Sequence, residues 1–163
     1  MYNEAYHLGK LLALSCHTVM SGAYIGAMEA ISKGAAEAGG HVIGVTCDEI
    51  ENWRPVRPNR WIQEERRFST ITERLIELVR GCDAAIALPG GPGTLTELSL
   101  AWNLMIVQSM PVKPLVLLGA GWLAMMQTFY HSFNDLIPQD QRNTILYAAD
   151  NEQALKIINR ALT

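Results

Sequence analysis

The sequence predicts a doubly wound α/β fold, in which a parallel sheet carries helices on both faces. Segments with helical periodicity alternate with short apolar segments along the whole 163-residue chain. The apolar segments lack the polar alternation of a half-exposed strand, which is typical of parallel strands buried on both faces. No internal repeat or low-complexity linker interrupts the alternation, so we expect a single domain over residues 1–163.

The first third of the chain contains two predicted helices and two predicted strands. An apolar face with spacings of three and four residues predicts a helix over residues 3–15. A short apolar run at residues 18–20 follows, and an alanine-rich helix over residues 25–38 ends at a glycine pair, a typical helix stop. Residues 41–46 form a continuous apolar run and predict a buried strand.

The segment from Asp48 to Phe68 has no regular period, and we expect a long loop there. It is rich in arginine, with Arg54, Arg57, Arg60, Arg66 and Arg67. A lid that presents a cation to phosphate and stacks Trp53 or Trp61 on a base would have this composition. The interleaved glutamates favour a solvated or dimer-facing loop instead.

The remainder of the chain continues the alternation of helices and strands. Thr70 and Glu73 fit a capping box, which predicts a helix over residues 71–81 with Ile71, Leu75, Leu78 and Val79 inward. Further helices are expected at 94–108, 122–133 and 152–161, and further strands at 84–88, 115–118 and 144–147.

Composition limits the partners that the protein can have. Hydrophobic residues make up 49% of the chain and charged residues 18%, as in a folded globular protein. The formal net charge of -3 provides no overall attraction to nucleic acid or to an anionic membrane. No apolar stretch approaches the ~18 residues that a membrane span requires. We therefore expect no nucleic-acid partner and no membrane partner.

Cysteine and histidine are too few and too scattered to predict a metal site. Cys16, Cys47 and Cys82 each lie among apolar residues, which is typical of reduced thiols in a cytoplasmic protein. The histidines show no spacing of the HExxH type, so no metal is expected. The apolar run at residues 11–14 is shorter than that of a secretory signal and follows Glu4. The sequence thus predicts a cytoplasmic location.

A glycine-rich turn joins a predicted strand to a predicted helix at Pro89–Glu97. Gly90, Gly91 and Gly93 allow the backbone to approach a ligand, and Thr94 adds a hydroxyl donor. Free amides at a helix N-terminus, together with the helix dipole, favour a phosphate there. The turn lacks the Gly-Lys-Ser/Thr ending of a Walker A loop and the GxGxxG pattern of dinucleotide folds.

The same turn also fits a purely structural interpretation. Thr94 and Glu97 have the spacing of a capping box, and the glycines are also typical of a tight turn between a strand and a helix. We favour ligand binding, because phosphate sites lie at the carboxyl ends of parallel strands.

The nine residues Pro89–Glu97 read Pro-Gly-Gly-x-Gly-Thr-x-x-Glu and resemble the signature of the LOG (Lonely Guy) family, which is often labelled lysine decarboxylase-like. Residues 21–30, including Gly22, are similar to a second glycine-rich turn of that family. Arg74 stands fifteen residues before the signature proline, where the family places an arginine. The resemblance extends from about Tyr2 to Leu118 and implies a Rossmann-like nucleotide-binding domain.

The resemblance implies hydrolysis of the N-glycosidic bond of a nucleoside 5'-monophosphate, AMP or an N6-modified AMP, giving free base and ribose 5-phosphate. It implies Arg74 and Glu97 as catalytic residues, and it implies a homodimer without a cofactor. Substrate and phosphate would be bound by Gly22, Gly90, Gly91, Gly93 and Thr94. The alternative is a non-catalytic carrier of a nucleotide or a phosphate-bearing cofactor, as in molybdenum cofactor carrier proteins. The residues alone would instead favour a surface pair of Arg74 with Glu77 or a snorkelling side chain, and only the resemblance reverses this preference.

The resemblance also implies a central strand and a glycine turn ahead of the first helix. This sequence opens with that helix, so we expect the first strand to be absent from the chain. Either the chain begins late, or another strand or subunit fills the place beside the phosphate site.

Overall fold

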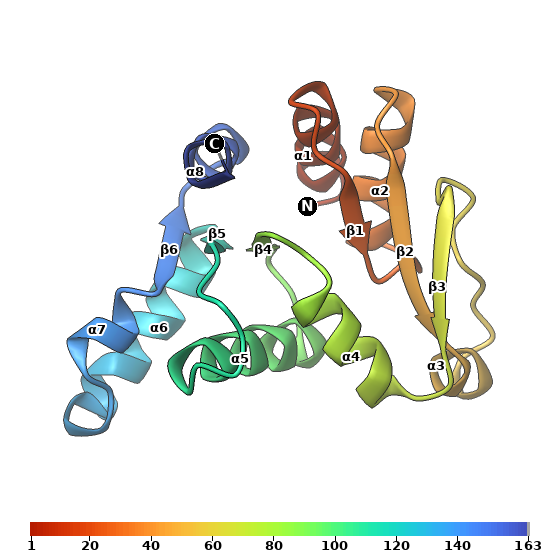
Figure 1. Cartoon of the computed structure of the whole chain (residues 1–163). Helices are drawn as coiled ribbons and strands as arrows, with labels where there is room; N and C mark the ends of the chain where they lie inside the picture. Colours follow the sequence, from red (N-terminus) through yellow and green to blue (C-terminus); the bar gives the residue numbers. More distant parts are fainter. Residues whose placement is uncertain (163) are drawn as a thin grey trace. The chain divides into compact units, whose positions relative to one another are not determined.

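The computed structural model describes residues 1–162 as two compact units, Met1–Cys82 and the residues from Asp83 onward. Each unit contains a three-stranded sheet, with strand orders β1-β2-β3 and β4-β5-β6 (Figure 1). All four strand pairings are parallel. The predicted α/β class with parallel sheets and surrounding helices is confirmed, whereas a single domain over residues 1–163 stays a prediction.

The first unit is built around β2, its central strand. Its elements are α1 (Tyr2–Leu14), β1 (Val19–Ser21), α2 (Ala27–Glu37), β2 (Val42–Cys47), α3 (Asp48–Trp53), β3 (Glu64–Phe68) and α4 (Ile71–Arg80). All six residues of β2 are buried, although successive side chains point to opposite faces. Helices α2 and α4 both contact this strand. Both faces of the sheet are therefore covered at its centre.

Helices α1 and α2 pack with their backbones in direct contact. A Cβ atom at Gly9 would collide with the carbonyl oxygen of Ile31, and one at Gly34 would collide with the carbonyl oxygen of Tyr6. Buried alanines flank this contact on both helices, at Ala5, Ala30 and Ala35. The small side chains thus set the distance between the two helices.

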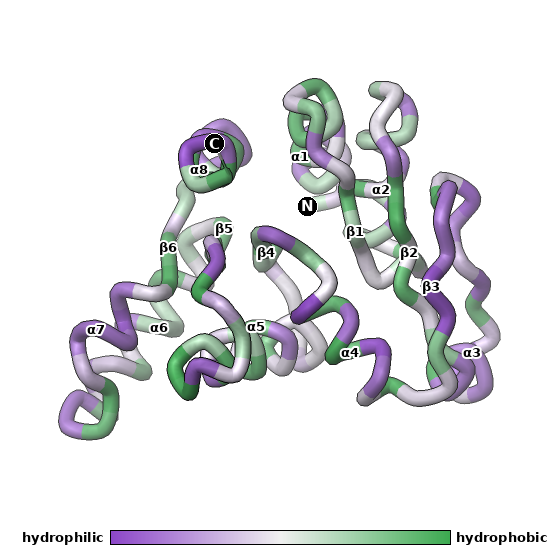
Figure 2. Tube along the Cα trace, in the orientation of Figure 1, coloured by the Kyte–Doolittle hydropathy of each residue, from purple (hydrophilic) through white to green (hydrophobic). Residues whose placement is uncertain are grey.

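The predicted loop over residues 48–68 is wrong at both of its ends. Residues Asp48–Trp53 form α3, and residues Glu64–Phe68 form β3. Strand β3 lies at a sheet edge and carries charged side chains, so it appears hydrophilic in a trace coloured by hydropathy (Figure 2). Hydrophobic periodicity cannot detect such a strand. Residues 54–63 have no helix or strand.

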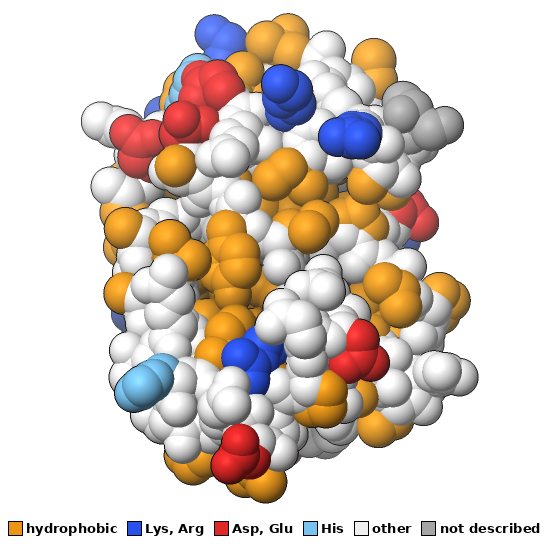
Figure 3. All heavy atoms as spheres, turned by 90° about the vertical axis from the view of Figure 1, so that its left-hand side faces the viewer, with side chains coloured by type: hydrophobic (Ala, Val, Ile, Leu, Met, Phe, Trp, Pro, Cys, Tyr) orange, Lys and Arg blue, Asp and Glu red, His pale blue; other side chains and the backbone are white. Residues whose placement is uncertain are grey.

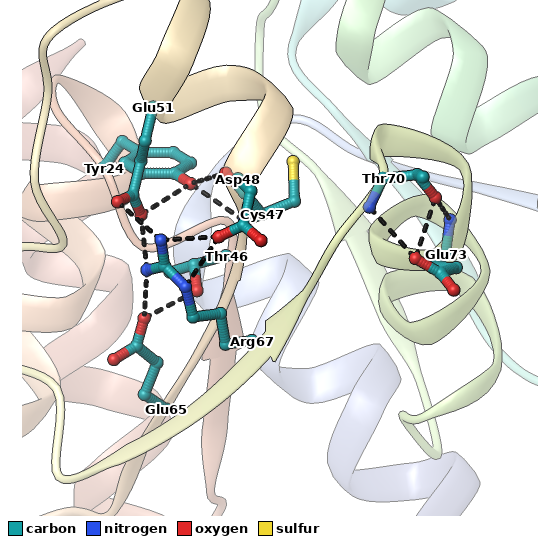
Figure 4. A network of polar contacts seen from close by, with 9 residues as sticks. All are labelled: Tyr24, Thr46, Cys47, Asp48, Glu51, Glu65, Arg67, Thr70 and Glu73. Carbon is teal, nitrogen blue, oxygen red and sulfur yellow. Dashed lines mark hydrogen bonds and ion pairs between the residues drawn. The ribbon is translucent and has the colours of Figure 1, made fainter.

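Helix α4 begins with the predicted capping box (Figure 4). The Thr70 hydroxyl accepts a hydrogen bond from the backbone N–H of Glu73 at 3.2 Å, and the Glu73 carboxylate accepts one from the N–H of Thr70 at 3.0 Å. Val79 is buried as expected, but Ile71 is 53% exposed. Ile71 is the first residue of the helix, and its backbone N–H donates a hydrogen bond to the Glu49 carboxylate of α3. Its side chain therefore lies at the exposed N-terminal end of α4.

The second unit is built around β5 in the same way. Its elements are β4 (Ala85–Ala87), α5 (Pro92–Ile106), β5 (Leu115–Leu118), α6 (Ala120–Ser132), the 3-10 turn η1 (Asn134–Leu136), α7 (Gln139–Arg142), β6 (Ile145–Ala148) and α8 (Asn151–Leu162). Every residue of β5 is buried, and helices α5, α6 and α8 contact the strand. The sequence did not predict η1 or α7, which are too short to show a helical period.

Strands β1 and β4 each have one partner strand within the described residues. The first element is α1, beginning at Tyr2, and β1 follows it. No helix in the described residues is long and apolar enough to cross a lipid bilayer.

Candidate active site

Arg74 of α4 is a buried cation held by backbone carbonyl groups. Its side chain is 7% exposed. The guanidinium donates from Nε to the carbonyl of Val45 at 2.9 Å and from Nη2 to the carbonyl of Gly22 at 3.1 Å. It also lies 5.7 Å from the centre of the Tyr24 ring. A guanidinium has five N–H donors, so donors remain for an anion.

The alternative partner of Arg74, Glu77, pairs with a different arginine. Arg66 donates to the Glu77 carboxylate at 2.6 Å and to the Glu64 carboxylate at 2.8 Å. Within Met1–Cys82, no carboxylate is paired with Arg74. The surface ion pair that the sequence left open is therefore not formed.

Gly22 lies directly against Arg74. A Cβ atom at this position would collide with Nη2 of Arg74 and would lie 2.6 Å from the sulfur of Met28. The backbone carbonyl of Gly22 accepts a hydrogen bond from the same guanidinium. The structure thus brings together two of the predicted site residues, and only glycine leaves room for the buried arginine.

The turn that contains Gly22 is held in place by hydrogen bonds from Asn59, in the irregular segment over residues 54–63. Ala23 has a φ of 70°, in the left-handed region, and its carbonyl accepts hydrogen bonds from the backbone N–H and the side-chain amide of Asn59, both at 2.8 Å. Ser21 is occupied within the turn, since its hydroxyl accepts from the N–H of Ala23 at 3.2 Å. Sequence reasoning missed Asn59, which no motif marks.

The segment of arginines and tryptophans is largely engaged in contacts inside the first unit. Arg67 pairs with Asp48, Glu51 and Glu65. Trp61 lies beneath the guanidinium of Arg60, 4.6 Å from the ring centre. Trp53, in contrast, is 81% exposed. Arg66 and Arg67 thus balance nearby carboxylates, as expected for a solvated segment.

In the second unit, the glycine-rich turn leads from β4 directly into α5. Gly91 is the N-cap residue and Pro92 is the first helical residue. Thr94 therefore lies inside the first turn, and the capping box proposed for Thr94 and Glu97 is not formed. The helix starts two residues earlier because proline is well suited to its first position.

Space around the glycines differs from one position to the next. A Cβ atom at Gly90 would collide with the side chain of Thr94, whereas one at Gly91 or Gly93 would meet no heavy atom within 4 Å. Gly90 therefore packs the turn against the helix. Gly91 and Gly93 leave the turn open to a ligand, beside the first backbone amides of α5.

Two residues of the second unit support this turn without having been predicted. The indole N–H of Trp122, in α6, donates to the carbonyl of Leu88 at 2.9 Å, just ahead of the motif. Gly119 has a φ of 100° and lies against the ring of Pro89. Glu97 is half-buried on α5. The available signal for Trp122 was its place three residues beyond Gly119, the glycine that follows the predicted strand over residues 115–118.

The predicted residues fall into two sets. Gly22 and Arg74 are in contact within the first unit. The second unit holds Gly90, Gly91, Gly93, Thr94 and Glu97 within one turn and the start of one helix.

Other reactive side chains form no further centre in the described residues. No group of three His, Cys, Asp or Glu residues there could hold a metal ion. The three cysteines differ in accessibility, because Cys16 is exposed, Cys47 is buried and Cys82 is intermediate. Burial raises the pKa of the Tyr24 hydroxyl above its ordinary value.

The profile of the protein family described as "Possible lysine decarboxylase" matches residues 28–158, a range that includes both Arg74 and the motif at Pro89–Glu97. The chain belongs to this family. The LOG family resemblance is thereby confirmed, since the curated LOG proteins are among the relatives of the chain.

Three curated plant relatives illustrate the similarity. The chain is 38% identical over 113 residues to "Cytokinin riboside 5'-monophosphate phosphoribohydrolase LOG" of Oryza sativa subsp. japonica, covering 68% of this chain and 46% of the relative. The rice protein named as probable LOGL9 is 34% identical over 113 residues, with 68% and 49% covered. LOG4 of Arabidopsis thaliana is 34% identical, with 68% and 52% covered. The chain spans about half the length of these relatives.

Solved structures similar to this chain include molybdenum cofactor proteins. The molybdenum cofactor binding protein of Rippkaea orientalis superposes with a TM-score of 0.78 at 26% identity, covering 99% of this chain and 88% of that one. The molybdenum cofactor carrier protein of Chlamydomonas reinhardtii gives 0.73 at 26% identity, with 99% and 87% covered. Both superpositions cover 99% of this chain and show that its fold is shared with these proteins.

Proposed function

We propose that the chain hydrolyses the N-glycosidic bond of a nucleoside 5'-monophosphate, AMP or an N6-modified AMP. The observation that carries the proposal is the structure that the intact family signature adopts. Residues Pro89–Glu97 make an open turn at the start of α5, with the half-buried Glu97 one turn further along the helix. The curated relatives named as cytokinin riboside 5'-monophosphate phosphoribohydrolases support the substrate class.

The reaction breaks the bond between the anomeric carbon of ribose and the base nitrogen. Water supplies hydroxyl to the carbon and its remaining proton to the base, and the bonding electron pair leaves with the base. The sugar acquires oxocarbenium character on the way. A carboxylate such as Glu97 would stabilise that positive charge and take the proton of the attacking water, which then passes to the departing base.

The remaining predicted residues are proposed to hold the substrate. Gly90, Gly91, Gly93 and Thr94 would bind the 5'-phosphate through backbone amides and the threonine hydroxyl. Arg74 would bind a substrate anion or hydroxyl with the guanidinium donors that its two carbonyl partners leave over. Gly22 would contribute by keeping that guanidinium in place.

A base-release assay tests the proposal. Purified protein is incubated with AMP and with N6-isopentenyl-AMP, and free base is separated from nucleotide by chromatography. We expect release with at least one of the two, and a loss of about 10²–10⁴-fold in Glu97→Gln. Thr96→Ser is the matched control, because the Thr96 hydroxyl bonds only the helix carbonyl of Pro92. Absence of release by the parent, or equal rates in Glu97→Gln, would refute hydrolysis.

A second candidate is a carrier that binds a nucleotide or phosphate-bearing cofactor without cleaving it. Its support is the superposition of 99% of the chain on the Rippkaea orientalis protein at a TM-score of 0.78. A carrier needs no catalytic carboxylate. AMP recovered intact after long incubation, and bound equally by Glu97→Gln and the parent, would favour this candidate.

We further propose that the protein is a cytoplasmic homodimer. Helices α5 and α6 form an open apolar pocket of about 260 Å³ lined mainly by Leu95, Leu98, Trp102, Met125, Met126 and Phe129. Figure 3 shows hydrophobic side chains gathered near the middle of the face that is drawn there. Light scattering after gel filtration should give twice the chain mass, and Phe129→Glu should reduce it. A monomeric parent protein at micromolar concentration would contradict the dimer.

A further inference from the structure

Arg74 has an unusual environment for a buried cation. Its two hydrogen-bond partners in the first unit are neutral carbonyls, those of Val45 and Gly22. Carbonyl groups fix two donors, but they do not neutralise the charge. The remaining contact is the face of the Tyr24 ring, 5.7 Å from the guanidinium carbon. An aromatic face attracts a cation strongly when both are removed from water.

Tyr24 is itself fixed at its far end. It is 3% exposed. Its hydroxyl accepts a hydrogen bond from the backbone N–H of Cys47 at 3.0 Å, and its proton can be donated to the Cys47 carbonyl at 3.2 Å or to the Glu51 carboxylate at 3.3 Å. The ring therefore cannot tilt without breaking contacts with the end of β2 and with α3.

The carboxylate that reaches Tyr24 is held in turn by Arg67 (Figure 4). Arg67 binds both oxygens of Glu51, each at 3.0 Å, and also pairs with Asp48 and Glu65. Glu65 accepts a further hydrogen bond from the hydroxyl of Thr46 at 2.6 Å. A connected series of contacts thus runs from ion pairs on α3 and β3 to the buried guanidinium.

We propose that Tyr24 is the positioning residue of Arg74, and that it acts through the face of its ring. The proposal rests on the proposed function for the role of Arg74 in binding nucleotide, but the contact itself does not. The ring holds the guanidinium by its face, which leaves the unused N–H donors in the plane of the guanidinium for a substrate oxygen.

The first test measures AMP affinity by calorimetry in the full chain. Tyr24→Leu should weaken AMP binding about tenfold, and Tyr24→Phe, which keeps the ring, should recover most of that loss. In an Arg74→Ala background, Tyr24→Leu should have no further effect. The matched control is Tyr6→Leu, a tyrosine of the same unit that contacts Lys33 and Glu37. An equal loss with and without Arg74 would assign Tyr24 a merely structural role and overturn the proposal.

The second test does not depend on nucleotide. In protein with ¹⁵N-labelled arginine, the Nε–H resonance of Arg74, assigned by its disappearance in Arg74→Lys, should shift and exchange faster in Tyr24→Leu but not in Tyr24→Phe. Tyr24→Met, whose unbranched and flexible side chain can fill an irregular space, replaces Tyr24→Leu if that variant does not fold. An unchanged resonance overturns the positioning role. A changed resonance in a protein that releases no base refutes hydrolysis alone.

Discussion

At the scale of single residues, the buried guanidinium of Arg74 explains why residue 22 is a glycine. Its sequence context predicted contact with phosphate or ribose, since it follows a strand and precedes a helix. The structure places its backbone carbonyl on Arg74 and leaves no room for a Cβ atom beside that guanidinium. Glycine is therefore required here by the side chain of Arg74, which comes from α4.

Replacement of Gly22 by alanine should displace Arg74 and lower base release more than tenfold, measured as kcat/KM with AMP. The reason is the collision of the new methyl group with Nη2 of Arg74 and with the Met28 sulfur. Gly34→Ala serves as control, because it perturbs the same unit away from Arg74. Similar losses in both variants, well below their melting temperatures, would show that general destabilisation is responsible.

Thr70→Ala should lower the free energy of unfolding by about 1 kcal/mol, because the N-cap hydroxyl bound to the N–H of Glu73 is lost. Urea denaturation measures the change. Thr72→Ala, on the exposed face of the same helix, should have little effect. Equal effects of the two substitutions would argue against the cap.

The capping box also makes stability depend on pH. Hydrogen bonds from Thr70 lower the pKa of the Glu73 carboxyl below its ordinary value of 4.5. A lowered folded-state pKa stabilises the fold above the unfolded-state pKa, and the contribution is lost as the pH falls through the folded-state pKa. Glu73→Gln should therefore lose stability relative to the parent at pH 7, and the difference should shrink as the pH falls below 4.5. A difference that is constant with pH would contradict this linkage.

At the scale of secondary-structure elements, the contact between α1 and α2 depends on glycine. Gly34→Ala should lower the free energy of unfolding by more than about 2 kcal/mol, because the new methyl group would collide with the carbonyl of Tyr6 and force the helices apart. The matched control is Gly121→Ala in α6, where a Cβ atom meets nothing within 4 Å. There the higher helix propensity of alanine should stabilise by up to about 1 kcal/mol. Opposite signs for the two substitutions are the expected result.

The sequence was sufficient for the elements whose burial is reflected in their composition. The apolar run of β2 and the capping box of α4 were both predicted, and both are found. Strand β3 was not, because Glu64 and Arg66 occupy it and its pairing with β2 comes from backbone hydrogen bonds that hydropathy does not record. The Gly-rich turn was likewise predictable, whereas Asn59 and Trp122 act through long-range bonds to backbone carbonyls.

At the scale of the whole molecule, each unit has one strand that is paired on both sides. Amide hydrogen exchange followed by mass spectrometry should therefore be slowest in β2 and β5, and faster in β3 and β6 at the sheet edges. Strands β1 and β4 have one partner each in the described residues, so they should exchange at the rate of edge strands. Protection of β1 or β4 equal to that of β2 would indicate a further strand hydrogen-bonded to it.

The graded accessibility of the three cysteines gives the protein an internal probe of its own unfolding. A maleimide should modify the exposed Cys16 within the folded chain, whereas the buried Cys47 can react only after β2 and its cover of helices have opened. The delay between the Cys16 adduct and the Cys47 adduct, each located by mass spectrometry of peptides, would therefore time the opening of the first unit without any introduced cysteine. The same measurement on Tyr24 variants would report whether the end of β2, where the Tyr24 hydroxyl binds the backbone of Cys47, opens earlier when that hydroxyl is removed.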